Sequence, residues 1–312
     1  MKVLYLTSSS FSGSTLLAFL LNAHPEIITV SEMIGWQYDQ DEDFECSCGK
    51  TLPDCPFFQN IAAAFRKNGL PFDFRQFGTG YSLVGSETLN RYLTECLPRI
   101  RNSSLERARD ALVMAVPPFA KTLKRQDLAN RSFISAALEY SHSSVFVDAS
   151  KDPHRMRHLS RVKDFDLQVL YLVRDPRGVS RSTMKTRKWD ATRAIEWWIR
   201  DQQNILRIST EFSSVLPVYY EDLCDSVNDT LARIHNFVDL QPEPFCGDFM
   251  AAEHHILGNS MRLTGQSNIQ KNERWREELS QADIDTITGT LNDFTANNPQ
   301  HALSAIIKHY LN

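Results

Sequence analysis

The feature that most constrains the fold is the amino-terminal segment KVLYLTSSSFSGSTLLAFLLNAHPEI, residues 2–27. It begins with a short apolar run, typical of a strand buried on both faces of a parallel sheet. A loop rich in serine and glycine follows at residues 7–13, and the apolar stretch 16–23 predicts a helix that ends at His24-Pro25. This order aims backbone N–H groups and the positive end of a helix dipole at one point. The segment is therefore a candidate anion site, although serines that merely cap a helix would look similar.

The rest of the chain repeats the same alternation. Further short apolar runs, each predicted to be a strand, lie at residues 26–32, 144–150, 167–173 and 215–220. Helical patterns lie between and after them, for example at 191–210, at 228–240 and from Arg274 to the end. Strands that alternate with helices predict an α/β fold with a mostly parallel central sheet and helices on both faces.

The stretch 33–142 does not follow this alternation. It holds a cysteine cluster, a loop rich in glycine and phenylalanine at 71–85, and then helical patterns up to Tyr140. We interpret it as a helical insertion in a single domain spanning 1–312. Insertions near the carboxyl ends of parallel strands commonly shape a substrate pocket. Its aromatic residues would line an apolar pocket or, as we favour, form a small core: Trp36, Tyr38, Phe57, Phe58, Phe72, Phe74 and Phe77.

Composition narrows the class of protein. With 312 residues, 42% hydrophobic and 23% charged, the chain resembles ordinary globular proteins. A net charge of −4 and a pI near 6.1 argue against a nucleic acid polymer as partner. We expect the basic clusters RMRHLSRVK (155–163) and KTRK (185–188) to be solvated helix faces. Because we find neither a signal peptide nor a run long enough to span a membrane, we expect a cytoplasmic location.

The amino-terminal loop departs from the motif of nucleotide-hydrolysing proteins. That motif reads GxxxxGK[ST], and its lysine reaches the terminal phosphates. Here Ser8 replaces the first glycine, and Ser14 stands at the lysine position between Gly13 and Thr15. An ATPase or a kinase is therefore disfavoured, whereas a donor whose transferred group is less charged remains compatible.

A second phosphate-binding candidate is YLVRDPRGVSRS, residues 171–182. A strand ends near Arg174, the chain turns at Asp175-Pro176, and a helix that includes Ser182 begins. The strand end and the helix start face the same crevice, so the arginine fork and the serine hydroxyl would bind one phosphate together.

Together the two segments resemble the phosphate-binding elements of the sulfotransferases that use 3′-phosphoadenosine 5′-phosphosulfate (PAPS). Those enzymes carry [basic]-S-G-[ST]-[ST] after the first strand and R-x7-S later, matched here by SGST at 12–15 and by Arg174 with Ser182. The resemblance implies a P-loop NTPase-like architecture, with the 3′-phosphate bound by this later pair. It implies that the phosphosulfate is bound by Ser12, Gly13, Ser14, Thr15 and Leu16.

Shorter matches extend the resemblance in islands over most of the chain. They are similar to segments of bacterial and carbohydrate-type members and comprise CSCGKTLPDCPFF (46–58), VDASKDPHR (147–155), YEDL (220–223) and GNSMR (258–262), followed by a helix start at Trp275. The fourth of these makes Arg262 a further candidate for binding the co-substrate.

The chain departs from the family at Phe11, where a basic residue usually precedes Ser-Gly. We expect Lys151, at the end of the third strand, to supply this cation, unless it is only a surface lysine. The resemblance makes Glu32 the candidate general base, the alternative being a partner for a nearby basic side chain. His24 is a rival base that would more simply end the helix. Asp148 and Asp152 would orient Lys151 or the acceptor.

The implied reaction is in-line transfer of the sulfuryl group from PAPS to a hydroxyl or amine, with release of PAP. Such a barrier falls mainly through positioning and electrostatic stabilisation, and we expect no metal to be required. The acceptor stays open among small molecules, glycans and lipids, and so does the oligomeric state. Two alternatives remain, a divergent P-loop nucleotide kinase and a catalytically silent protein that binds PAP or another nucleotide.

Three of the six cysteines, Cys46, Cys48 and Cys55, lie close together in the sequence. Zinc needs four ligands, usually from C-x2–4-C pairs, and no histidine lies near these cysteines in the sequence. We therefore expect free thiols, with a zinc site and a disulfide as alternatives.

Overall fold

A parallel sheet organises the molecule. The computed structural model describes residues 1–33, 44–95, 102–258, 260–263 and 267–311. Within these residues five strands pair in the order β2-β3-β1-β4-β5, and each pairing is parallel. Their bounds are β1 (Lys2–Ser8), β2 (Ile27–Ser31), β3 (Val145–Lys151), β4 (Asp166–Val173) and β5 (Val215–Tyr219). The predicted strands and their parallel arrangement are confirmed.

Helices connect and follow the strands. The first strands are linked by α1 (Ser14–Asn22), α2 (Pro56–Lys67), α3 (Glu87–Thr94), α4 (Ser103–Ala115) and α5 (Pro117–Ser141). The later connections are α6 (Pro153–Leu159), α7 (Pro176–Arg187) and α8 (Ala191–Ser209). After β5 come α9 (Tyr220–Asp225), α10 (Val227–Phe237), a 3₁₀ turn at Ser260–Leu263, α11 (Trp275–Glu278), α12 (Gln281–Asn297) and α13 (Ala302–Leu311).

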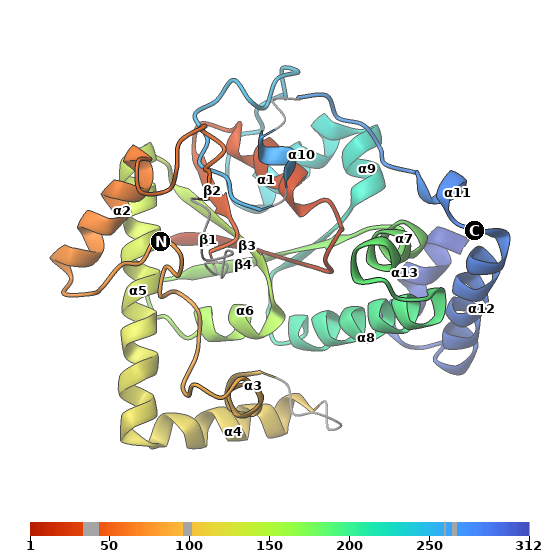
Figure 1. The fold of residues 1–312 in the computed structure, drawn as a ribbon, viewed down its shortest axis with the longest axis horizontal. Helices are drawn as coiled ribbons and strands as arrows, with labels where there is room; N and C mark the ends of the chain where they lie inside the picture. The colour runs from red at the N-terminus through yellow and green to blue at the C-terminus, as the bar shows by residue number, and fades with distance from the viewer. Residues whose placement is uncertain (34–43, 96–101, 259, 264–266, 312) are drawn as a thin grey trace.

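The sheet is covered on both faces, as predicted. Leu4 and Leu6 of β1 join a core with α1 and α10, while Val3 and Tyr5 pack into the cores on the opposite face, where α5, α6 and α8 lie. Figure 1 shows α1 and α10 above the sheet and α6 and α8 below it. The apolar run of β1 reflects this two-sided burial, because neither set of alternating side chains meets solvent.

The strand order brings the candidate residues to the carboxyl ends of the strands. After β1 the chain crosses to β2 at the far edge, returns through β3, and then crosses β1 to reach β4. Ligands of open α/β sheets bind beyond the carboxyl ends of the strands, where the direction of winding switches. The loop after β1, Glu32 after β2, Lys151 and Arg174 all lie at this edge. His24 precedes β2 and therefore lies at the amino ends of the strands, on the other side of the sheet from this site.

The helices between β2 and β3 hold an aromatic core. Phe57, Phe58 and Phe77 are fully buried together with Phe65 and Phe133, whereas Phe72 and Phe74 are partly buried against them. The favoured prediction of a core is therefore confirmed for these side chains. Trp36 and Tyr38 lie outside the described residues.

The prediction that RMRHLSRVK is a solvated helix face is wrong. Every residue of α6 is buried. Arg157 donates to Glu106 of α4 at 2.8 Å and to Glu211 at 2.7 Å, so its charge is neutralised within the protein. The sequence pattern shows only that the segment is basic; the acidic partners come from helices far along the chain. KTRK, by contrast, is exposed, as predicted.

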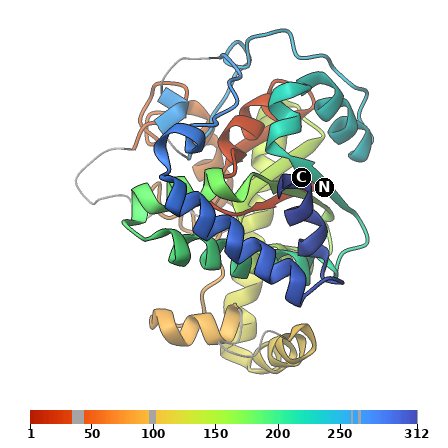
Figure 2. The ribbon, with the colours of Figure 1, turned by 90° about the vertical axis from the view of Figure 1, so that its right-hand side faces the viewer.

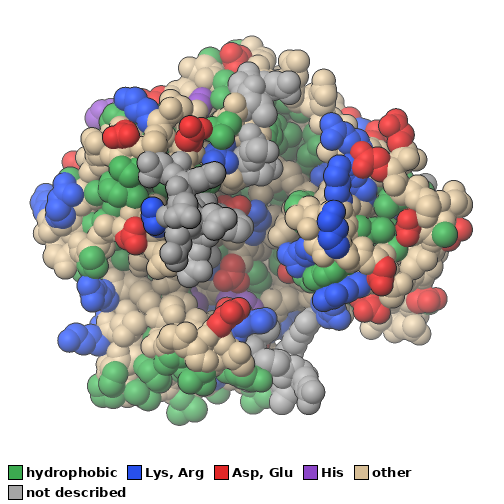
Figure 3. Space-filling model, viewed as in Figure 1, with side chains coloured by type: hydrophobic (Ala, Val, Ile, Leu, Met, Phe, Trp, Pro, Cys, Tyr) green, Lys and Arg blue, Asp and Glu red, His purple; other side chains and the backbone are tan. Residues whose placement is uncertain are grey.

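The carboxyl-terminal helices complete the molecule. Figure 2 shows α12 lying across α7 and α8, and side chains of α12 and α13 share a buried cluster with α8 that includes Trp198 and Leu291. Figure 3 shows hydrophobic side chains gathered over α4, where Leu105, Leu112 and Met114 are exposed. Among the described residues, no helix combines the length and apolar character needed to cross a membrane.

Candidate active site

The loop after β1 leads into α1 through a left-handed glycine. Gly13 has φ 89° and is the N-cap of α1, and Leu17 N–H donates to its carbonyl at 3.1 Å. The preceding N–H groups in the first turn have no acceptor within the helix, so they point at the space before it. A Cβ on Gly13 would lie 2.5 Å from Cδ2 of Tyr220. Both the backbone angle and the tyrosine ring therefore require glycine here.

Three residues at or near this loop have a strained, left-handed backbone. Phe11, Ser31 and Lys151 have φ values of 67°, 66° and 70°, which side-chain-bearing residues rarely adopt. Such angles cost about 1–3 kcal/mol each and concentrate at functional sites. The hydroxyls of Ser12 and Ser31 are also buried and have no hydrogen-bond partner among the described residues. Buried hydroxyls beside a helix N-terminus and a close-packed glycine fit a phosphate-bearing ligand.

Glu32 and Lys151 meet beside the loop. β2 and β3 are neighbours, so their ends bring the two residues together, and Lys151 Nζ lies 2.6 Å from Glu32 Oε1. The two side chains are only 10% and 20% exposed, with glutamate the less exposed. This arrangement places a carboxylate and an ammonium group at the loop despite Phe11.

The other acidic candidates serve different contacts. Asp148 Oδ2 accepts from Arg155 Nε at 2.9 Å, and its other oxygen accepts from Ser150 N–H. No described contact links Asp148 to Lys151. Asp152 accepts from His154 N–H at 2.9 Å and so caps α6. The expectation that Asp148 orients Lys151 is thus replaced by a buried pair with Arg155.

His24 has a structural environment. Its Nε2 lies 3.1 Å from the Gln241 carbonyl, and its Nδ1 accepts from Glu26 N–H. Both ring nitrogens are therefore occupied, at the sheet edge away from the loop. This environment supports a role in ending the helix rather than in proton transfer.

Arg174 reaches the loop from β4. It is buried, and its two terminal nitrogens donate to the carbonyls of Phe11 at 2.8 Å and Asn272 at 2.6 Å. Its guanidinium also lies 4.5 Å from the ring centre of Tyr220. Ser182 lies one turn beyond Gly178, to whose carbonyl its hydroxyl donates at 3.0 Å. Arg174 packs on that same Gly178, since a Cβ there would lie 3.3 Å from Arg174 Nε.

Tyr220 connects these parts. Its ring lies against Gly13 and under Arg174, and its hydroxyl accepts from Asn272 N–H at 3.1 Å. Burial raises the pKa of Tyr220 to about 12, so the phenol stays neutral near pH 7. No motif in the sequence marks Asn272, and Tyr220 is visible only as part of YEDL. Their contribution depends on contacts between distant segments.

Arg262 lies on the segment that covers the loop. Its Nε donates to the Glu45 carbonyl at 3.0 Å and its Nη1 to the Gly258 carbonyl at 2.9 Å. Gly258 in turn lies against the loop, because a Cβ there would be 3.2 Å from Thr15 Oγ1. Arg262 is thereby held by the carbonyls of Glu45 and Gly258, of which Gly258 packs beside the phosphate loop.

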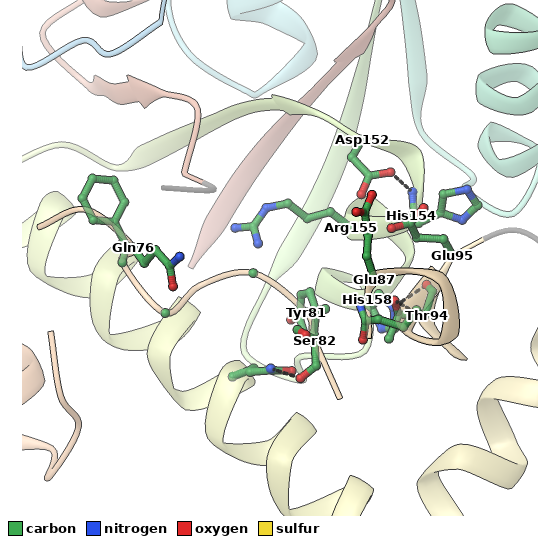
Figure 4. Close-up of a pocket in the computed structure, with 15 residues that line it drawn as sticks. Gln76, Tyr81, Ser82, Glu87, Thr94, Glu95, Asp152, His154, Arg155 and His158 are labelled. Atoms are coloured by element: carbon green, nitrogen blue, oxygen red, sulfur yellow. Dashed lines mark hydrogen bonds between the residues drawn. The ribbon is translucent and has the colours of Figure 1, made fainter. Parts of the chain in front are cut away.

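A cavity of about 650 Å³ is lined in part by Asp152, the residue that follows Lys151 in the sequence. Figure 4 shows Glu87, Glu95 and Asp152 towards one end of it and Gln76 at the other. Burial, and then the charge of Asp152, raise the pKa of Glu95. Burial lowers the pKa of His158 to about 4, so this ring is neutral near pH 7. The cavity therefore combines carboxylates and hydroxyls with apolar surface.

A family model described as the sulfotransferase family matches residues 86–244. Among curated proteins no match was found. The chain is similar to the solved sulfotransferase domain of the Synechococcus PCC 7002 olefin synthase, with TM-score 0.46, 19% identity, and coverage of 93% of this chain and 94% of that one. For the sulfotransferase domain from the curacin biosynthetic pathway, the values are 0.44, 17%, 91% and 88%.

Proposed function

Because the chain belongs to the sulfotransferase family, we propose that it transfers a sulfuryl group from PAPS to a hydroxyl or amine and releases PAP. The observation that carries the proposal is the meeting of Glu32 and Lys151, 2.6 Å apart, at the sheet edge where the phosphate loop begins α1. PAPS, when bound, supplies an activated sulfuryl group and a phosphate leaving group. The protein then has to position the reactants, stabilise charge and accept a proton.

The phosphate loop is proposed to bind the 5′-phosphosulfate. Backbone N–H groups from Gly13 to Leu16 point before α1, and the hydroxyls of Ser14 and Thr15 begin the helix. The buried hydroxyl of Ser12 offers another donor. A helix N-terminus provides such a site without a lysine, which supports a donor of this kind over the terminal phosphates of ATP.

Arg174 and Ser182 are proposed to bind the 3′-phosphate. Arg174 donates to two carbonyls, and among the described residues no carboxylate pairs with it. A buried guanidinium without an ionic partner favours an anionic ligand, because its charge is otherwise poorly compensated. Arg262, beside Gly258, is proposed to support the loop side of the same ligand.

Glu32 is proposed to accept the proton of the acceptor. As the new oxygen–sulfur bond forms, the acceptor proton moves to the Glu32 carboxylate. The bond between sulfur and the bridging oxygen breaks, and its electron pair stays on the departing phosphate. Lys151 then loses its charged partner and is left to stabilise that phosphate together with the loop N–H groups. The ion pair therefore supports both roles from one contact.

The cavity beside Lys151 is proposed to bind the acceptor. Residues of the 33–142 insertion, among them Glu87 and Glu95, line it together with Asp152 and His154. Carboxylates accept hydrogen bonds from hydroxyl groups, so we favour a polar acceptor such as a glycan over a lipid. The insertion would thus shape the acceptor site within one sulfotransferase domain.

Ligand binding and transfer test the proposal. At about 100 times its Kd, a ligand stabilises the folded protein by about 2.7 kcal/mol, so PAP should raise Tm by several degrees, more than ADP or ATP with magnesium. Labelled sulfate should then pass from PAPS to members of a polar acceptor panel. A preference for ADP with magnesium would favour a kinase. Binding of PAP without transfer to any acceptor would favour a silent nucleotide-binding protein.

A further inference from the structure

Four side chains converge away from the phosphate loop. The Sγ atoms of Cys46, Cys48 and Cys55 and Nδ1 of His255 all lie within 4.8 Å of one another. Cys48 Sγ lies 3.7 Å from Cys55 Sγ, and His255 Nδ1 lies 3.2 Å from Cys55 Sγ and 3.7 Å from Cys46 Sγ. The cysteines come from one loop, while the histidine lies 200 residues beyond Cys55.

These separations match the edges of a small tetrahedron. With Zn–S bonds of about 2.3 Å, Zn–N bonds of about 2.05 Å and tetrahedral angles, two sulfur ligands lie about 3.8 Å apart. A sulfur and a nitrogen ligand then lie about 3.6 Å apart. A disulfide would instead need sulfurs about 2.05 Å apart. The three separations given above, and the 4.8 Å bound on the others, thus fit four ligands around one ion better than a covalent bond.

We propose that Cys46, Cys48, Cys55 and His255 bind a structural zinc ion. Three thiolates and one imidazole form a common ligand set of closed structural zinc sites, and soft sulfur ligands favour zinc over the oxygen-seeking cations. This site replaces our expectation of free thiols, which rested on the lack of a histidine near the cysteines in the sequence. The fold supplies that histidine from the other end of the chain.

The surroundings of the cluster fit this role. His255 Nε2 lies 3.0 Å from the Glu253 carboxylate, which directs Nδ1 towards the sulfurs. Metal-bound histidines commonly make such a contact, which fixes the tautomer and the ring orientation. The Phe57 ring stacks on His255 with centroids 4.6 Å apart, and Cys46, Cys55 and His255 are buried. Gly49 N–H donates to the Cys46 carbonyl at 2.9 Å, which closes the loop tightly.

The ion would join the cysteine loop to the segment around His255, which is about 200 residues away in the sequence. Ser47 Oγ lies 3.2 Å from the His254 carbonyl and accepts from Ile256 N–H, and Leu257 N–H donates to the Val30 carbonyl of β2. Next to the cluster, the Glu45 carbonyl accepts from Arg262. The zinc would therefore clamp the 44–55 loop to residues 253–258 and keep Gly258 against the phosphate loop.

Metal analysis of the purified full chain tests the site. We expect about one zinc per chain by elemental mass spectrometry, with Cys46, Cys48 and Cys55 protected from a thiol reagent until a chelator is added. After anaerobic exchange, cobalt should show the charge-transfer and visible bands of a tetrahedral thiolate complex. A disulfide among these cysteines, three freely reactive thiols that bind no added zinc, or iron or copper in its place would each overturn the proposal.

Variants separate the ligands from other cysteines. Cys55→Ser should lose the bound zinc, while Cys246→Ser, at an exposed free cysteine outside the cluster, should retain it. Because Cys55→Ser risks unfolding, Glu253→Gln is the second variant, changing a 68% exposed side chain. It should keep the fold and lower zinc affinity about 10–100-fold in chelator competition. Retention of wild-type zinc affinity by both Cys55→Ser and Glu253→Gln would overturn the site.

A link to the active site rests on the proposed function. If zinc holds residues 253–258 against the phosphate loop, its removal by a chelator should weaken PAP binding while the central sheet stays folded by circular dichroism. A protein that contains zinc but never binds PAP would refute the proposed function and leave the zinc site intact. Unchanged PAP affinity after complete zinc removal would refute only the link between them.

Discussion

Two ion pairs lie near the carboxyl end of β3, and they differ in burial and in the number of their hydrogen-bond partners. Asp148 and Arg155 are 0% and 2% exposed, and Arg155 also donates to the Thr79 carbonyl and to Asn130 Oδ1. Glu32 and Lys151 are 10% and 20% exposed, and one described contact joins them. The first pair is saturated with partners, whereas the second retains capacity for further contacts.

The difference separates a structural role from a chemical one. Arg155 of α6 pairs with Asp148 of β3 and also contacts the 33–142 insertion, at Thr79 and at Asn130 of α5, so its charge serves the packing of these segments. Lys151 instead has φ 70° at a strand end, beside two other strained residues. Lys151 has a strained backbone, and the pair is partly exposed and joined by one described contact. Such a pair can exchange its contacts when a ligand binds. We therefore expect substitutions in the Asp148–Arg155 pair to lower stability, and substitutions in the Glu32–Lys151 pair to lower activity.

The largest effect should follow loss of the buried pair. Asp148→Ala leaves the Arg155 charge uncompensated in the interior, so the free energy of unfolding should fall by about 3–5 kcal/mol. Chemical denaturation measures this. Asp164→Ala, which breaks an exposed pair with Arg131 at 2.8 Å, is the matched control and should cost less than about 1 kcal/mol. Equal losses in the two variants would remove the contrast.

The next effect concerns catalysis instead of stability. Glu32→Gln removes the proposed base and keeps its shape, so sulfuryl transfer should slow at least about 100-fold, the lower range for general-base catalysis. PAP affinity and Tm should stay near those of the wild type. Transfer assays with labelled PAPS and calorimetric PAP titration provide the two readouts. Near-normal turnover would show that Glu32 is not the base.

Arg174 extends the comparison to a buried cation whose described hydrogen bonds go to carbonyls. Arg174→Ala should weaken PAP by about 10–100-fold, since a hydrogen bond to a charged group contributes about 1.5–3 kcal/mol. Adenosine 5′-phosphosulfate, which lacks the 3′-phosphate, should lose much less. Arg181→Ala, on the same helix as Ser182, is the control because Arg181 pairs with Glu278 at the surface. Equal losses for both nucleotides would refute the 3′-phosphate assignment.

The smallest effect is the contribution of the Glu32–Lys151 pair to folding. A double-mutant cycle with Glu32→Gln and Lys151→Met should give a coupling of less than about 1 kcal/mol in the free energy of unfolding, because partly exposed pairs are screened by solvent and salt. Denaturation at low and high salt measures it. A coupling as large as that between Asp148 and Arg155 would make Glu32–Lys151 a structural pair as well.

Local patterns predicted much of the fold and the edge at which the candidate residues gather. The sequence predicts the strands β1 and β4 and the loop between Ser8 and Ser14. It can do so because two-sided burial and helix capping depend on neighbouring residues. The burial of α6 escaped the same analysis. Its Arg157 pairs with carboxylates on α4 and just beyond α8, and no local pattern encodes such distant partners.

By itself, then, the sequence determined the alternation of strands and helices, the serine- and glycine-rich loop before α1, and the absence of a lysine in that loop. Only the tertiary structure decided that Lys151 meets Glu32, that Tyr220 leaves no room for a side chain at Gly13, and that His255 joins three distant cysteines. The physical reason is range. Backbone and burial preferences act over a few residues, whereas ion pairs and ligand sets form between segments that only the folded chain brings within reach.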